Sequence, residues 1–151
     1  MRDVVRAAVA GALATVPMTV AMELAFRALP RGLRYPLPPR QITDEMDAVA
    51  GRPLPRDEQS HLVATLLAHV AYGAAAGSGF VLVPSRGMAR SMVNGIAYGL
   101  GLWAISYVGW LPALRLMPTP SGQPRERVAL MVGAHVVWGA SLGLFARAFR
   151  R

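Results

Sequence analysis

Long apolar stretches separated by small groups of arginines make up most of this chain. Only one carboxylate falls inside the four stretches, which run between Arg6 and Arg27, His61 and Arg86, Arg90 and Arg115, and Arg127 and Arg147. The hydrocarbon core of a bilayer is about 30 Å thick, so about 20 apolar residues in a helix suffice to cross it. Since lipid offers no hydrogen bonds to the backbone, each stretch predicts a helix.

We therefore expect an all-α polytopic membrane protein with a single domain over residues 1–151. The sequence places four transmembrane helices at about residues 5–28, 61–83, 90–113 and 127–148. Arginines at the ends of the apolar stretches are typical anchors of such spans.

The long connection after the first span, from about Pro30 to Ser60, carries a different pattern. Between Gln41 and Ala50 the apolar residues Ile42, Met46 and Val49 fall on one face of a helix, and acidic residues fall elsewhere. This amphipathic pattern predicts a short helix that lies flat at the bilayer interface.

Composition and charge narrow the classes of partner. Apolar residues make up 54% of the chain, and the net charge is +8. A nucleic-acid-binding protein needs a continuous basic stripe, whereas these arginines lie between apolar stretches, so the expected partner is the lipid bilayer and not nucleic acid. The absence of cysteine excludes disulfides, thiolate metal sites and thiol catalysis.

An internal similarity links the second and fourth spans. Residues 68–77 (AHVAYGAAAG) and 134–143 (AHVVWGASLG) share six identical positions of ten. The similarity predicts two tandem two-helix repeats, related in parallel about an axis along the membrane normal. His69 and His135 occupy the same position in the two copies, so we expect their imidazoles at the same depth.

Small residues recur every fourth position on the predicted spans, which allows helices to approach closely. The predicted packing glycines are Gly73, Gly77, Gly95, Gly99, Gly139 and Gly143. His69 and His135 lie on the same stripes, so each should face protein. Exposed stripes of this kind would also permit a homo-oligomer.

Ionisable groups inside a membrane are costly and often mark function, which singles out His69, His135 and Glu23. One interpretation is a proton-responsive site formed by these three residues. A second is ligation of a b-type haem or a metal by the two histidines. A third is a packing or assembly protein with an aromatic girdle of Trp103, Tyr107, Trp110 and Trp138. Glu23 could instead form a surface ion pair with Arg27, one turn away.

Motifs of soluble enzymes do not occur in the sequence. It has no phosphate-binding loop, no GxSxG element and no HExxH element. We therefore predict that the chain is not an enzyme, with no catalytic residue, no cofactor and no dedicated metal site.

Several segments together resemble the YagU-like bacterial inner-membrane proteins. They are Val16-Pro17-Met18-Thr19, the run from Tyr35 to Arg40 with Gln41-Ile42-Thr43 after it, the AHxxYG and AHxxWG elements at 68–73 and 134–139, and Gly109-Trp110-Leu111-Pro112. The resemblance implies a multi-pass protein of the bacterial cytoplasmic membrane with a link to acid resistance. It assigns no catalytic residue and no mechanism, so the biochemical activity is left open.

Overall fold

The computed structural model describes residues 1–51, 57–84 and 87–150, and this part of the chain is helical without strands. It contains four helices long and apolar enough to cross a membrane. They are α1 (Arg2–Ala28), α3 (Glu58–Ser78, continued by the 3-10 turn η2, Gly79–Leu82), α4 (Met88–Ala104, continued by η3, Ile105–Trp110, and α5, Leu111–Ala113) and α6 (Arg125–Ala148). The predicted all-α fold with four spans is confirmed, and each helix begins two or three residues earlier than predicted.

The first connection contains the helix α2, Pro38–Val49, and a 3-10 turn, η1, Arg31–Leu33. Helix α2 begins three residues before the predicted start because Pro38, with its fixed φ, is well suited to the first helical position. Gly51 follows the helix with φ +64°, a conformation that glycine adopts without strain. The helix packs against the beginning of α3, which the amphipathic pattern alone did not predict.

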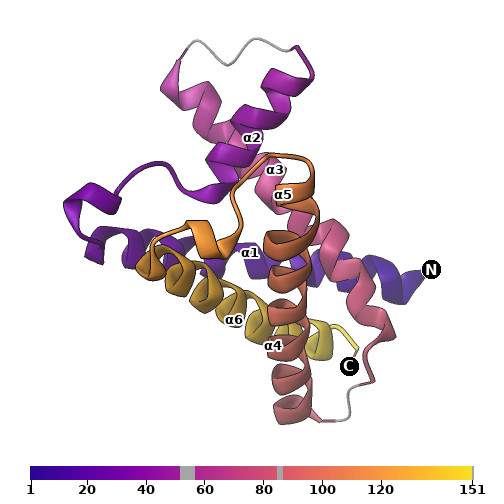
Figure 1. Cartoon of the computed structure of the whole chain (residues 1–151). Helices are drawn as coiled ribbons and strands as arrows, with labels where there is room; N and C mark the ends of the chain where they lie inside the picture. Colours follow the sequence, from indigo (N-terminus) through magenta and orange to yellow (C-terminus); the bar gives the residue numbers. More distant parts are fainter. Residues whose placement is uncertain (52–56, 85–86, 151) are drawn as a thin grey trace.

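The spans form an open row in the order α3, α1, α6, α4, because α1 packs against α3 and α6, and α4 packs against α6. Helices α3 and α4 lie at the ends of this row and diverge from α1 and α6 toward the end that carries α2 (Figure 1). Tyrosine hydroxyls bridge α3 and α4: Tyr98 donates to the carbonyl of Ala76 at 2.7 Å, and Tyr72 bonds Ser106 at 3.0 Å. The two chain termini lie together, away from α2 (Figure 1).

Glycines allow α1 and α3 to touch along their backbones. A Cβ added to Gly11 would collide with the carbonyl oxygen of Gly73 and lie 2.7 Å from the Cα of Gly77. Trp138 of α6 donates its indole N–H to the carbonyl of Gly11 at 3.2 Å, so the same turn of α1 also holds α6.

Helices α4 and α6 meet in the same manner. A Cβ on Gly95 would collide with the carbonyl of Gly139, and a Cβ on Gly99 would lie 2.5 Å from the carbonyl of His135. Ser91 donates its hydroxyl to the carbonyl of Gly143 at 2.8 Å, which closes the contact. The structure thus places all six predicted packing glycines against a neighbouring helix. The internal duplication of the second and fourth spans stays a prediction.

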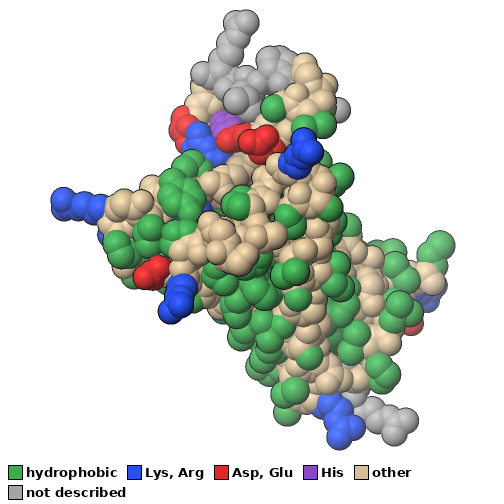
Figure 2. All heavy atoms as spheres, in the orientation of Figure 1, with side chains coloured by type: hydrophobic (Ala, Val, Ile, Leu, Met, Phe, Trp, Pro, Cys, Tyr) green, Lys and Arg blue, Asp and Glu red, His purple; other side chains and the backbone are tan. Residues whose placement is uncertain are grey.

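Large apolar side chains cover the outer faces of the spans. On α1 the exposed positions form one stripe: Val9, Leu13, Val16, Val20 and Leu24. In the view of Figure 2 hydrophobic side chains cover the body of the molecule, and charged side chains gather toward its extremities. This distribution suits a protein whose outer surface contacts lipid.

Candidate functional site

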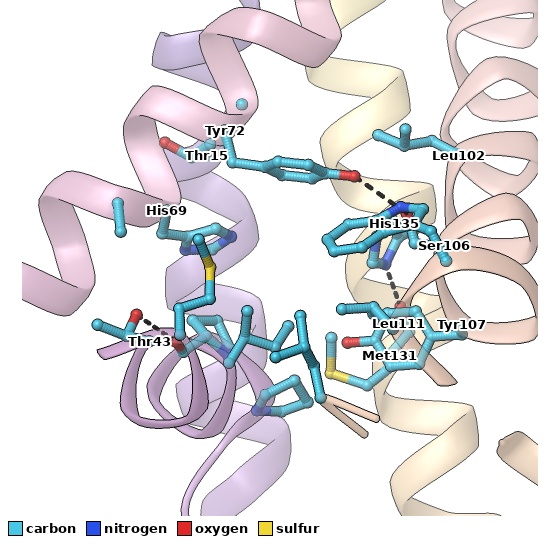
Figure 3. Close-up of a pocket in the computed structure, with 18 of the residues that line it drawn as sticks. Thr15, Thr43, His69, Tyr72, Leu102, Ser106, Tyr107, Leu111, Met131 and His135 are labelled. Carbon is cyan, nitrogen blue, oxygen red and sulfur yellow. Dashed lines mark hydrogen bonds between the residues drawn. The ribbon is translucent and has the colours of Figure 1, made fainter. Parts of the chain in front are cut away.

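A cavity of about 540 Å³ lies between α3 and the end of α4, and five helical elements line it, with α4 and its continuations η3 and α5 counted as one. Thr15 and Met18 of α1 and Met131, His135 and Trp138 of α6 belong to its lining. Helix α3 and the end of α4 form opposite walls, and α2 closes one end (Figure 3). A volume of this size is typical of small-molecule sites.

The lining is apolar with a few polar groups and carries no Asp, Glu, Lys or Arg among the described residues. The hydroxyls of Thr15 and Thr43 donate to the carbonyls of Ala12 and Pro39, so they are used within their own helices. Any occupant of this cavity is therefore surrounded by uncharged groups. A charged head group would lose its hydration there without a counter-ion.

Three of the four residues predicted to form an aromatic girdle instead line this cavity: Tyr107, Trp110 and Trp138. Tyr107 and Trp110 belong to η3, where the last part of α4 is π-helical. Ser106 on the same segment accepts a hydrogen bond from the indole of Trp110 at 3.2 Å and bonds Tyr72 across the cavity. Single π-helical turns are rare in helices and are frequent at functional sites.

His135 is held by its backbone and by an aromatic ring. Its Nδ1 lies 2.8 Å from the carbonyl oxygen of Met131, and because a carbonyl only accepts, Nδ1 carries the proton. The ring of Tyr107 meets the imidazole edge-on, with centroids 6.0 Å apart. In the neutral ring the Nε2 atom then carries a lone pair, and His135 lines the cavity with only 6% of its surface exposed.

For His69 the neighbouring group is a hydroxyl, which can donate or accept, so the other hydrogen bond of that hydroxyl indicates where the imidazole proton lies. Its Nδ1 lies 3.4 Å from the hydroxyl of Thr19, which donates its single proton to the carbonyl of Thr15 at 2.8 Å. The hydroxyl of Thr19 is therefore the acceptor and Nδ1 of His69 the donor. Both histidines thus hold Nδ1–H and leave Nε2 as an acceptor. Neither Nε2 has a hydrogen-bond partner within the described chain.

The structure brings His69 and His135 to one cavity, on facing walls (Figure 3), but it does not bring Glu23 to them. Glu23 is exposed on α1 and accepts a hydrogen bond from Arg27 at 2.9 Å. The structure therefore does not join all three residues in one site. The surface ion pair, which spacing along the helix equally favoured, is the arrangement that forms.

Sequence reasoning missed two buried groups that fasten the first connection over the cavity. Arg127 of α6, 3% exposed, donates to the carbonyls of Leu33 (3.1 Å), Tyr35 (2.9 Å) and Pro36 (2.8 Å). Its guanidinium also lies over the ring of Tyr35, 3.7 Å from the centroid. The sequence indicated only an arginine at the end of a span.

His61 is the second of these groups. No role for it was predicted from the sequence, but it is 5% exposed, and its Nε2 donates to Asp44 of α2 at 2.6 Å. Beside it, Arg40 bonds both oxygens of Glu58, at 2.5 and 2.9 Å, and this contact raises the pKa of Arg40. These pairs join α2 to α3, and they could have been suspected only from the charges on both sides of the connection.

No family model, curated protein or solved structure matches the chain. The similarity to the YagU-like proteins, and the acid resistance that it implies, therefore stay predictions.

Proposed function

We propose that this multi-pass membrane protein binds an uncharged, lipid-soluble small molecule in the cavity between α3 and α4. The observation that carries the proposal is a cavity of about 540 Å³ with an apolar lining, set among helices that suit a membrane. Lipid-soluble molecules reach such a site from the bilayer. The bacterial cytoplasmic membrane is the location that the sequence resemblance favours.

The α2 helix supports this role because it contributes Ile42, Thr43 and Met46 to the lining. Two groups of contacts, Arg127 with the carbonyls before α2 and His61 with Asp44, hold it in place. A helix that merely lay on the membrane surface would not need a buried arginine. These contacts are explained if the first connection, with α2, serves to close the apolar cavity.

Binding can be tested with the dimethyl ether of octylresorcinol, an uncharged aromatic molecule with an apolar tail. Native mass spectrometry of the purified protein, released from detergent, should detect saturable binding of one molecule per chain. Ala68→Phe fills the cavity and should abolish binding, whereas Ala71→Phe lies on the same helix outside the lining and should not. Absence of saturable binding of both this ether and its parent octylresorcinol, or equal loss in both variants, would contradict the proposal.

Haem binding is a second candidate that one observation favours. Histidines that ligate metals commonly donate their other ring N–H to a backbone carbonyl, as Nδ1 of His135 does to Met131. Two Nε2 lone pairs from different helices are the ligands that a b-type haem uses. A purified haem-bound protein would have a Soret band that His69→Ala and His135→Ala remove, and a colourless protein after expression with added haem would exclude it.

A proton-responsive role, if the implied acid resistance holds, rests on His69 and His135 without Glu23. Proteoliposomes subjected to a pH jump provide the test, because flux that depends on the two imidazoles should drop in His69→Leu and His135→Leu. Glu23→Gln should leave the flux unchanged, since Glu23 pairs with Arg27 at the surface.

A further inference from the structure

The inference below deepens the proposed function by naming the head group of the ligand. The cavity is uncharged, and its two histidines face each other from α3 and α6 (Figure 3). Each is anchored through Nδ1–H, His135 to a backbone carbonyl and His69 to a hydroxyl whose own proton is already donated. If either imidazole moved its proton to Nε2 or turned its ring over, it would lose the hydrogen bond that its Nδ1–H donates.

These anchors decide what the cavity offers to a ligand. A neutral imidazole with its proton on Nδ1 presents Nε2 as an acceptor and cannot donate from that atom. Two acceptors on different walls pair best with a head group that donates two hydrogen bonds, which ketones, quinones and esters cannot do. An anionic head is disfavoured as well, because the lining contains no cationic side chain among the described residues.

We infer that the ligand is a neutral hydroxylated lipid, with hydroxyl groups that donate to Nε2 of His69 and Nε2 of His135 and an apolar tail among the remaining lining residues. An aromatic diol fits the surroundings well, since Tyr72, Trp110 and Trp138 supply aromatic surface around the two imidazoles. Phenolic hydroxyls are also stronger donors than aliphatic ones. This inference rests on the proposed function. It adds that the ligand donates two hydrogen bonds, one to each histidine.

Three probes that differ only in their donors test the inference. Octylresorcinol has two hydroxyls, its monomethyl ether has one and its dimethyl ether has none, while ring and tail stay the same. A hydrogen bond to a buried acceptor contributes about 1 to 1.5 kcal/mol, which is about a tenfold change in the dissociation constant. We expect affinity for the wild-type protein to fall about tenfold for each methyl group added.

Variants assign the two steps to the two histidines. In His135→Leu and in His69→Leu one step should disappear, and in the double variant all three probes should bind alike. The dimethyl ether provides the control for folding, because it makes neither hydrogen bond and should bind each variant as it binds the wild type. A variant that no longer binds this ether has lost the cavity, and a phenylalanine substitution at the same position, which keeps a ring but has no acceptor, then replaces it.

The outcomes separate the inference from the proposed function. Equal affinity of all three probes for the wild-type protein would overturn the inference and leave an apolar binding cavity. Persistence of both steps in the double variant would also overturn it, because the donors would then pair with other groups. Saturable binding of none of the probes would reject the proposed function itself.

Discussion

Arg127 lies within a predicted membrane span, and its guanidinium donates three hydrogen bonds to its own chain. Three backbone carbonyls before α2 accept its protons, and the ring of Tyr35 covers its face. Taking an arginine out of water is costly, and the hydrogen bonds to three carbonyls offset part of that cost, whereas carbonyls left without donors would be costly as well. The role of Arg127 depends on contacts with residues about 90 positions earlier in the chain, so it could not be predicted from the sequence around it.

The first prediction follows from these contacts. Arg127→Met should lower the free energy of unfolding by about 3 kcal/mol, because three buried carbonyls lose a charged donor. Thermal unfolding in detergent, followed by circular dichroism, measures the loss. The control is Arg125→Met, an exposed arginine two residues earlier on the same helix, which should change stability by less than about 0.5 kcal/mol. Equal effects of both substitutions would contradict the role of Arg127.

Arg127→Lys separates charge from geometry at the same position. Lysine keeps the positive charge but has no planar fork that reaches three carbonyls together. Its stability should therefore lie between those of the wild type and Arg127→Met.

At the scale of elements, the contact between α4 and α6 depends on glycines that have no room for a side chain. Gly139→Ala should lower stability by roughly 1 to 3 kcal/mol, because the new Cβ would meet the backbone of Gly95, which cannot move away as a side chain would. Gly133 lies on the same helix with nothing within 4 Å of an added Cβ. Gly133→Ala should be neutral or stabilising by up to about 1 kcal/mol, through helix propensity. Thermal unfolding of both variants checks the contrast, and a stable Gly139→Ala would contradict the close contact.

The beginning of α3 depends on a cap that titrates. Asp57 accepts the backbone amide of Ser60 at 2.8 Å, which lowers its pKa below the usual value. Because the folded pKa lies below that of the unfolded chain, the ionised cap stabilises the helix above about pH 3.9, and this stabilisation is lost as the pH falls further. Hydrogen exchange of the first-turn amides, corrected for intrinsic rates, should thus increase from pH 6 to pH 3.

Two variants identify the group responsible. Asp57→Asn keeps an acceptor that does not titrate, so its protection in the first turn should be the same at both pH values. In Asp57→Ala, which has no acceptor at this position, the first-turn amides of α3 should exchange fast at both pH values. A pH response that survives in Asp57→Asn would assign the effect to another carboxylate.

The elements themselves were largely predictable, and the reasons are local. The length of an apolar stretch predicts a membrane-spanning helix, because the thickness of the bilayer sets the same minimum length for every span. A glycine at every fourth position also specifies a packing surface without knowledge of its partner, as the contacts of Gly95 and Gly139 illustrate. The surroundings of His61 were not predictable, since they depend on how α2 folds back onto α3. Glu23 had two equally good interpretations along the helix, and only the position of the cavity decides between them.

At the scale of the whole molecule, the cavity results from the order in which the helices pack. With α1 and α6 in the middle of the row, α3 and α4 are held apart except where tyrosines bridge them. No local pattern encodes this order, because the small-residue stripes of all four helices would suit several arrangements. The two histidines could therefore be paired from the repeat, but the space between them could not be predicted.

The arrangement of the spans yields the last prediction. An even number of crossings places both termini on one side of the membrane and α2 with the turn η4 (Pro120–Gly122) on the other. Since the chain has no cysteine, single-cysteine variants can be labelled with a membrane-impermeant maleimide without background. Asp3→Cys and Arg150→Cys should be labelled from the same side, and Asp47→Cys and Ser121→Cys only from the opposite side. Labelling of Asp3→Cys and Ser121→Cys from one side would mean that a helix does not cross. The cavity would then lie outside the hydrocarbon core, where a lipid-soluble ligand could not reach it through the bilayer.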